Sequence, residues 1–445
     1  MCGRVPFRLF DTGCLFKVSP LKHMKRRINV TLLLISIAVI IIALPSPLNQ
    51  RARAQVGIQF GAQRFPSIDV DRNDKLYLMM AVATAPASER RPHSQIFFVS
   101  SNDGGTTWDN LPHTRNLSNS PGEAFAPALA VFKNGTPRAY VTYQDNSTKT
   151  TQAYLIRSKK KAKFRQPLNI TPHDGAAFSP RVAIDSTEGV NIVWGDAKDP
   201  QGKVAFVRST DQGASFTPIL DVSRSSGNAG EPEIAVGPDD AINVVWEDTA
   251  PGQSVIMYAR STDAGVTFSE PLQVSNSSGP AVEGAIAVDS QGRVSVVWVD
   301  DGDGNPDAFY ARSTDQGQTF SEPMDVSGFR EGNIHKPSVT TFEDTVYVAF
   351  QNGDLFGDDD IRNRQVYLTK SSNAGVSFGE SEKVSNANNN VGRAHSASMV
   401  VDSRGVLHIV WIDASVVGND EGLLFYSRTT NGRTFTTERM ILAII

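Results

Sequence analysis

The sequence repeats one short pattern along most of its length. The fullest copy, residues 258–275, reads YARSTDAGVTFSEPLQVS, and close copies stand at 208–216 (RSTDQGASF) and 312–323 (RSTDQGQTFSEP). Their closing aromatic residues, Phe216, Phe268 and Phe320, recur every 52 residues. A fixed period of this length indicates a repeat architecture, in which each unit buries its core against its neighbours.

Weaker copies extend the repeat in both directions. They lie at residues 100–108 (SSNDGGTTW), 370–378 (KSSNAGVSF) and 427–435 (SRTTNGRTF), and a degenerate KKKAKF at 159–164 fills the gap before Phe216. The sequence therefore predicts seven units, which begin near residues 65, 125, 178, 231, 284, 337 and 396. Six units are the alternative, if 125–177 or 396–445 is not a repeat.

Each unit contains four short β-rich runs separated by Gly, Asp, Asn and Pro. In the unit that begins near 231, these runs include PEIAVG at 232–237, INVVWED at 242–248 and PLQVS at 271–275. Such runs predict four antiparallel strands per unit. The expected fold class is all-β: a β-propeller of four-stranded antiparallel blades, because radial repetition leaves only short, protected strand edges.

The repeated pattern, Ser-x-Asp-x-Gly-x-Thr/Ser-Phe/Trp, suits a tight turn between the third and fourth strands. The Asp side chain can accept hydrogen bonds from its own turn, the Gly can adopt positive φ, and the aromatic can pack between sheets. We therefore expect a structural role for the pattern's aspartates, which are Asp103, Asp211, Asp263 and Asp315.

This pattern resembles the Asp-box, or BNR repeat, of the sialidase superfamily. Four copies are complete, at Ser101, Ser209, Ser261 and Ser313. The resemblance covers the chain after residue 55 and implies a propeller, but Asp-boxes also occur in propellers that only bind ligands. We therefore interpret the protein as a non-canonical or non-catalytic relative.

The resemblance also allows a test of the sialidase site, which combines three arginines, a Tyr nucleophile, a Glu and an Asp. Arg64 and Pro66 match the first arginine motif, and Glu231 in GEPEI matches the glutamate. The place of the second arginine holds Glu247-Asp248, and no Tyr opens a late unit. Arg330 and Arg393 are arginines without an assigned role. If the protein is an enzyme, we expect a sialidase-type glycoside hydrolase that uses Arg64 and Glu231.

The face opposite the Asp-box turns is the expected binding face. An acid follows the second apolar run in most units, as Asp248 and Asp300 do, and His335 and His395 lie in the links between units. These four are the predicted binding residues. The alternative is that each aspartate caps its own turn.

One loop has the spacing of a calcium site. Asp301, Asp303, Asn305 and Asp307 place oxygen ligands at every second position, although the distant Glu of an EF-hand is missing. The alternative is an acidic turn. We expect no required cofactor, with calcium as the one candidate.

The N-terminal segment, residues 1–54, is expected to be separate from the propeller of residues 55–445. Basic residues at 22–27 precede the apolar run 30–44 and the small residues 52–54, which is the order of a secretory signal peptide. An uncleaved membrane anchor is the alternative. We therefore predict a secreted or cell-envelope protein that contacts a membrane only through an uncleaved N-terminus.

Charge and cysteine content exclude several classes of function. The whole chain has net charge −4, and removal of residues 1–54, with 9 basic and 1 acidic residues, leaves 34 − 46 = −12. So acidic a chain is a poor nucleic-acid binder. Both cysteines, Cys2 and Cys14, precede the signal, so the propeller has no disulfide or thiolate site.

Together these features predict a secreted propeller that binds a glycan or protein on the face opposite the Asp-boxes. An exo-sialidase or other glycoside hydrolase is the first alternative, and a structural propeller of the cell envelope is the second.

Overall fold

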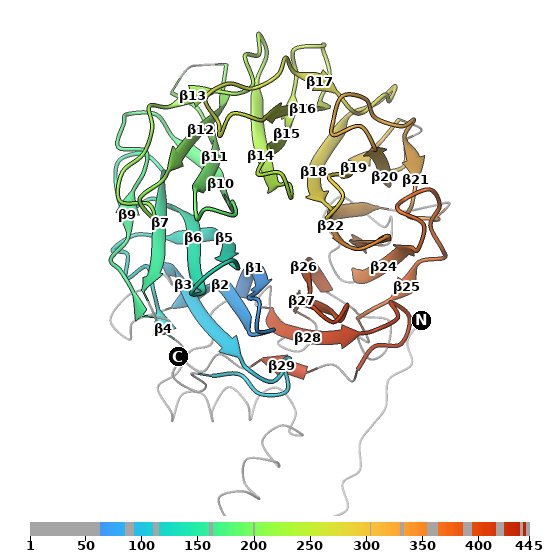
Figure 1. Ribbon diagram of the computed structural model, residues 1–445, viewed down its shortest axis with the longest axis horizontal. Helices are drawn as coiled ribbons and strands as arrows, with labels where there is room; N and C mark the ends of the chain where they lie inside the picture. Colours follow the sequence, from blue (N-terminus) through green and yellow to red (C-terminus); the bar gives the residue numbers. More distant parts are fainter. Residues whose placement is uncertain are drawn as a thin grey trace, which may run out of the picture. The chain divides into compact units, whose positions relative to one another are not determined.

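The described part of the chain forms a ring of seven blades (Figure 1). The structure is a computed structural model that describes residues 63–84, 93–109, 115–159, 163–198, 201–302, 304–329, 333–353, 364–385, 394–414, 422–436 and 439–441. Each blade is one antiparallel sheet whose strands follow in sequence order from the centre outward, except that in blade 2 two short outer strands, β8 and β9, both pair with β7. This confirms the predicted all-β propeller and the count of seven.

The strands of the first three blades are as follows. Blade 1 comprises β1 (Gln63–Val70), β2 (Leu76–Thr84), β3 (His93–Ser101) and β4 (Arg115–Asn116). Blade 2 comprises β5 (Ala124–Phe132), β6 (Arg138–Asp145), β7 (Gln152–Lys159), β8 (Lys163–Phe164) and β9 (Leu168–Asn169). Blade 3 comprises β10 (Ala177–Ile184), β11 (Val190–Asp196), β12 (Lys203–Ser209) and β13 (Leu220–Asp221).

The remaining blades repeat this plan. Blade 4 comprises β14 (Ala229–Val236), β15 (Ile242–Asp248), β16 (Val255–Ser261) and β17 (Leu272–Gln273). Blade 5 comprises β18 (Ala281–Val288), β19 (Val294–Asp300), β20 (Asp307–Ser313) and β21 (Met324–Asp325). Blade 6 comprises β22 (Ile334–Phe342), β23 (Thr345–Asn352), β24 (Gln365–Ser371) and β25 (Glu382–Lys383). Blade 7 comprises β26 (Ala394–Val401), β27 (Leu407–Asp413), β28 (Leu423–Thr429) and β29 (Arg439–Ile441).

The hydrophobic core lies between the blades. Each cluster of buried side chains draws on two adjacent sheets, because both faces of every central strand are covered by a neighbour. The same packing closes the ring, where Ile68 and Leu78 of blade 1 share a cluster with Val410 and Tyr426 of blade 7. Among the described residues, all four strands of blade 7 come from the C-terminal part of the chain, and packing, hydrogen bonds from Ser403 to Asp74 and the ion pair between Arg404 and Asp74 (3.3 Å) join blade 7 to blade 1.

The Asp-box turns have the predicted structure. In the first box, Asp103 accepts hydrogen bonds from the backbone N–H (2.8 Å) and hydroxyl (2.6 Å) of Thr107, and Ser101 Oγ accepts one from Gly105 N–H. In the fourth, the equivalent bonds from Thr319 hold the pKa of Asp315 at about 2. The carboxylates of Asp103 and Asp315 are thus used within their own turns.

The glycine of each Asp-box makes a contact that the sequence pattern does not reveal. A Cβ atom on Gly265 would lie 2.3 Å from the Phe206 ring, and one on Gly317 would lie 2.0 Å from Tyr258 Oη. Phe206 and Tyr258 belong to the third strand of the preceding blade, and they also contact the box aromatics Phe268 and Phe320. The box therefore docks each blade onto its predecessor.

This contact yields a first testable prediction, with Gly292 as a matched control. Gly265 and Gly292 both have φ +78°, but the nearest atom to a Cβ on Gly292 is 3.9 Å away. Alanine at either position pays about 1–2 kcal/mol for the left-handed backbone. Only Gly265→Ala also overpacks the interface, at a cost of about 1–3 kcal/mol. Urea denaturation of both variants measures the difference, and equal losses of stability would contradict the docking role.

The N-terminal prediction concerns another part of the chain. The expected signal peptide or anchor, and the boundary at residue 54, lie outside the described residues. Within the described residues, no helix is long and apolar enough to cross a bilayer.

Candidate functional site

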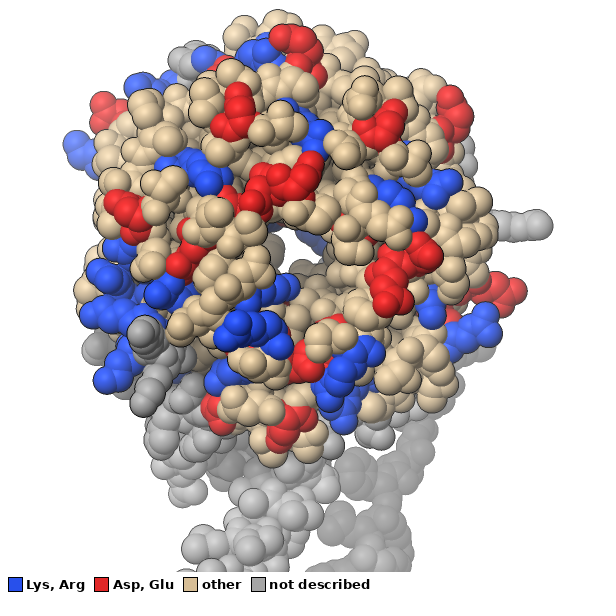
Figure 2. All heavy atoms as spheres, viewed as in Figure 1, with Lys and Arg blue, Asp and Glu red and all other residues tan. Residues whose placement is uncertain are grey.

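The first strand of every blade carries the same irregularity near its start. The third residue of each has φ between +45° and +56°, and the pairing with the second strand shifts register there, as in a β-bulge. These strands line the central channel (Figures 1 and 2), so the bulges lie around one of its mouths. The bulge residues are Phe65, Ala126, Ser179, Glu231, Glu283, Lys336 and Ser396.

This mouth is on the face opposite the Asp-boxes. In blade 4, the start of β14 pairs with the end of β15 (Ala229 with Asp248), whereas the start of β15 pairs with the Asp-box serine, Ser261. Because the seven bulges share one backbone conformation but carry different side chains, the fold does not dictate those side chains. They are therefore the positions at which function can vary.

Four successive blades gather charged and polar groups at this mouth. We call this set the acidic arc; its members are Ser179, Glu231, Glu247, Glu283, His335 and Lys336. Glu231 is exposed and accepts a hydrogen bond from Ser179 Oγ (2.6 Å) across the boundary between blades 3 and 4. Three carboxylates thus come from blades 4 and 5 alone.

Glu247 is the partly buried member of the acidic arc. It lies in β15 beside the bulge, paired with Gly230, and its Oε1 accepts the backbone N–H of Glu283 at 2.7 Å. Burial raises the pKa of the Glu247 carboxyl, and repulsion from Glu231 and Glu283 raises it further. Glu247 therefore favours the protonated state more than an ordinary glutamate does.

Glu283 has the opposite environment. Its Oε2 accepts the backbone N–H of Lys336 (2.6 Å), and Lys336 Nζ lies 3.0 Å from its Oε1. His335 Nδ1 is 3.7 Å from the same carboxylate. Burial alone would raise the pKa of Glu283, but His335 and Lys336 outweigh it and lower the pKa to about 2. Glu283 is therefore ionised at neutral pH.

The repeat itself shows that a carboxylate is not structurally required at position 247. In blade 6 the same position is Gln351, which pairs with His335 and accepts the bulge N–H of Ser396 (3.2 Å). In blades 3, 5 and 7 the position is Gly195, Val299 or Ile412. Since an amide can accept the bulge N–H equally well, this hydrogen bond does not explain why a half-buried carboxyl group is present at Glu247.

The predicted binding residues occupy different environments. Asp248 and Asp300 are buried, and each accepts the indole N–H of a tryptophan in its own strand (3.1 Å from Trp246 and Trp298) and a backbone N–H of its own turn. His335 lies in the acidic arc. His395 lies in blade 7, where its Nδ1 is 3.1 Å from Ser396 Oγ.

The structure does not show where the side chains of the expected arginines lie. Arg64 is in β1, but its side chain lies outside the described residues, as do Arg330 and Arg393 entirely. Glu231 is thus the one sialidase-type catalytic candidate whose side chain the structure places. The position expected for the second arginine holds the acid Glu247.

The calcium loop is described only in part, because Asp303 lies outside the described residues. Asp307 lies in β20, pairs with Asp300 and accepts a hydrogen bond from Ser327 Oγ (3.1 Å). Asp301 and Asn305 lie in the turn before it, and Asp301 Oδ1 is buried without a hydrogen-bond partner among the residues that the structure describes. The described residues contain no group of three or more acidic, His or Cys side chains arranged for a metal. Calcium binding stays a prediction.

The sequence analysis missed most of the acidic arc. It selected Glu231 and His335, but not Glu247, Glu283 or Lys336 as site residues. A comparison of the repeats could have identified Glu247, because the equivalent position in the other units is Ala, Gly, Val, Ile or Gln.

Comparison with known proteins is consistent with this fold. No protein-family model and no curated protein sequence matches the chain. Among solved structures, an ulvan lyase, a polysaccharide lyase, is similar with a TM-score of 0.58 and 11% identity over 83% of this chain and 94% of that one. A protein of unknown function from Dyadobacter fermentans has a TM-score of 0.50 and 18% identity over 83% and 94%.

Sialidases are also among the similar structures. A Hadza microbial sialidase has a TM-score of 0.48 and 16% identity, and the match covers 66% of each chain. At these identities the likenesses show the propeller fold and nothing of the activity.

Proposed function

We propose that the protein binds a glycan at the channel mouth that carries the acidic arc. The observation behind this proposal is that Glu231, Glu247 and Glu283 of blades 4 and 5 interact electrostatically, with Lys336 of blade 6 at 3.0 Å from Glu283. Carboxylates accept strong hydrogen bonds from sugar hydroxyls, and His335 and Lys336 can donate to sugar oxygens. The N-terminal signal expected from the sequence would place this binding outside the cytoplasm.

The charge of the site defines the class of glycan. Three clustered carboxylates in a propeller of net charge −12 would repel a sugar that carries a carboxylate or sulfate. The ligand of the ulvan lyase is -[GlcA(1-4)Rha3S]-, an acidic glycan. That structure supports glycans as the ligand class for the fold, whereas the acidic arc favours neutral or amino sugars for this chain.

A glycan array tests the proposal with purified protein and two variants. The double variant Glu231→Gln/Glu247→Gln keeps the size and hydrogen-bonding shape of both side chains but removes both charges. Loss of charge-assisted hydrogen bonds should weaken binding about tenfold or more. Glu322→Gln, an exposed glutamate beside the Asp-box of blade 5, is the control and should bind normally. Equal binding by all three proteins would exclude the acidic arc as the site.

A second candidate function is glycoside hydrolysis at the same place. It is favoured by the opposite pKa shifts of Glu247 and Glu283, which are joined through the Glu283 backbone N–H. Glycosidases use a carboxylic acid of raised pKa beside an ionised carboxylate. The acid protonates the leaving oxygen, and the carboxylate stabilises positive charge or activates water. This hypothesis does not require the sialidase tyrosine.

A further inference from the structure

Blade 2 replaces the Asp-box with a basic hairpin. Its third strand continues into Lys159 and pairs with the short strand β8, so that Ser158 lies opposite Phe164 and Lys159 opposite Lys163. Phe164 still packs edge-on against Phe98 of the preceding blade (5.0 Å between ring centroids), as the box aromatics do elsewhere. The docking function of the box is thus retained by Phe164, and the basic residues are not needed for it.

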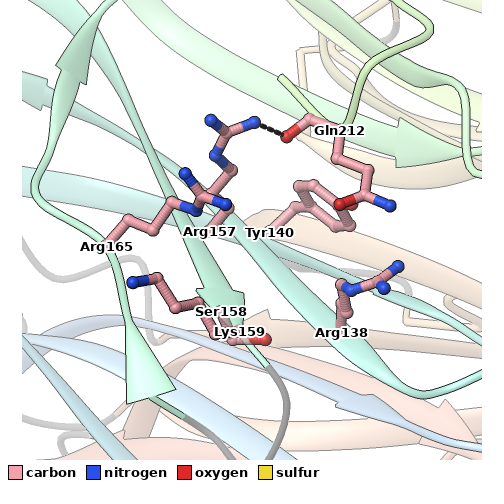
Figure 3. Close-up of a pocket in the computed structure, with 7 residues that line it drawn as sticks. All are labelled: Arg138, Tyr140, Arg157, Ser158, Lys159, Arg165 and Gln212. Carbon is pink, nitrogen blue, oxygen red and sulfur yellow. Dashed lines mark hydrogen bonds between the residues drawn. The ribbon is translucent and has the colours of Figure 1, made fainter. Parts of the chain in front are cut away.

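The hairpin borders a cavity of 160 Å³ between blades 2 and 3 (Figure 3). Arg157 and Lys159 of β7 and Arg165, which follows β8, line one side, and Arg138 of β6 and Gln212 from the Asp-box of blade 3 line the other. Of the described residues that line the cavity, four are therefore cationic and none is acidic. The cavity is on the Asp-box face and is separate from the acidic arc.

Most of this positive charge has no acidic partner among the described residues. Arg138 pairs with Glu188 of blade 3. Arg157 donates to the backbone carbonyl of Gln212, as Arg428 does to that of Gly104, so this contact belongs to the repeat. Burial and the like charge of Arg165 lower the pKa of Arg157. For Lys159, Arg157 and Arg165, the described part of the chain contains no ion pair.

The equivalent arginines of the next two blades are neutralised. Arg208 pairs with Asp185 and Arg260 with Asp239, and both acids come from the turn between the first and second strands. In blade 2 the corresponding turn, residues 133–137, reads KNGTP and has no acid. The chain thus holds three cations together at one cavity, although their mutual repulsion is unfavourable.

We propose that this cavity binds a tetrahedral oxyanion, a sulfate or phosphate group that is either free or carried on a polymer. Such a group offers several acceptor oxygens to converging guanidinium and ammonium donors, and it would neutralise the repulsion between Arg157 and Arg165. Lys159 and Arg165 supply the charge that is specific to this site, whereas Arg138 and Arg157 are also held by protein contacts.

Titration calorimetry of the full chain with inorganic phosphate and with inorganic sulfate, at constant ionic strength, tests the proposal. The double variant Lys159→Gln/Arg165→Gln should bind either ion about tenfold more weakly or worse. The double variant Lys149→Gln/Lys198→Gln changes net charge equally, at exposed lysines outside the cavity, and should bind within about twofold of the unmodified protein. Absence of binding by the unmodified protein, or equal weakening in both double variants, would overturn the proposal.

Retention on dextran sulfate, compared with uncharged dextran, distinguishes the two sources of the anion. Retention that the Lys159→Gln/Arg165→Gln change abolishes identifies a polymer-borne group. Loss of ion affinity in this variant without a change in retention identifies the free ion. Neither result depends on the acidic arc, so the glycan proposal and the oxyanion proposal fail or succeed separately.

Discussion

Replacement of Trp298 by alanine is expected to destabilise the propeller by about 3–5 kcal/mol, the usual cost of truncating a fully buried aromatic side chain. Trp298 in β19 has no exposed surface and belongs to the core cluster between blades 4 and 5. Its ring stacks on Phe309, and its indole N–H donates to Asp300 at 3.1 Å. Truncation therefore opens a cavity and also removes one partner of a buried carboxylate. Equilibrium denaturation in guanidinium measures the loss.

Trp194 provides the matched comparison for the hydrogen bond. It occupies the same strand position in blade 3 and is equally buried, but its indole nitrogen has no hydrogen-bond partner in the described part of the chain. Asp196, the equivalent of Asp300, instead faces His173, whose Nε2 is 3.3 Å away. Trp298→Phe should consequently cost about 1 kcal/mol more than Trp194→Phe, the net worth of one hydrogen bond. A larger loss in the Trp194 variant would contradict this assignment.

The second large effect concerns hydrolysis. For a glycoside that the protein hydrolyses, Glu247→Gln is expected to lower kcat by about 10²–10⁴, because the amide cannot protonate the leaving oxygen. Gln351 already accepts the equivalent bulge N–H in blade 6, so the variant should fold normally. Steady-state turnover of neutral aryl glycosides, with Glu322→Gln as the control, measures the effect. Unchanged kcat in Glu247→Gln would contradict the assignment of Glu247 as the general acid.

The pH dependence of kcat supplies an independent check. Glu247 must be protonated to act as the acid, so activity should fall as pH rises through its pKa, which burial places above that of an ordinary glutamate. Glu283 must be ionised, so activity should fall on the acid side only as pH approaches its pKa of about 2. In the expected profile, activity therefore falls on the alkaline side at a pH above the pKa of an ordinary glutamate, and on the acid side only near pH 2. An alkaline limb near the pKa of an ordinary glutamate would contradict the assignment of Glu247.

Much of the fold could be predicted because the spacing of the repeated pattern gives the length of one blade. The aromatic spacing set the unit length, and the units predicted near 178, 231 and 284 begin in the structure at Ala177, Ala229 and Ala281. Even the degenerate copy in blade 2 was placed correctly, because Phe164 keeps the packing contact after the rest of the pattern is lost. Alternating apolar runs encode each sheet locally, so no distant contact is needed to recognise them.

The acidic arc could be predicted only in part. Glu231 was selected from a motif resemblance, but Glu247 and Glu283 lie 36 residues apart in two different blades. They meet because the bulge at Glu283 turns its backbone N–H toward the neighbouring blade. A register shift of this kind leaves no clear mark on the alternation of polar and apolar residues, so the sequence pattern does not show which side chains it brings together.

The sequence by itself determined the architecture of this protein: seven repeated units, four strands in each, and Asp-box turns whose hydrogen bonds are local. Only the tertiary structure decided which charges share an environment. It placed Glu247 half-buried among other acids and Glu283 beside Lys336, and it left the cations of blade 2 around one cavity. The physical reason is that strand formation depends on neighbours in sequence, whereas burial and electrostatic interactions depend on distances that exist only once the ring has closed.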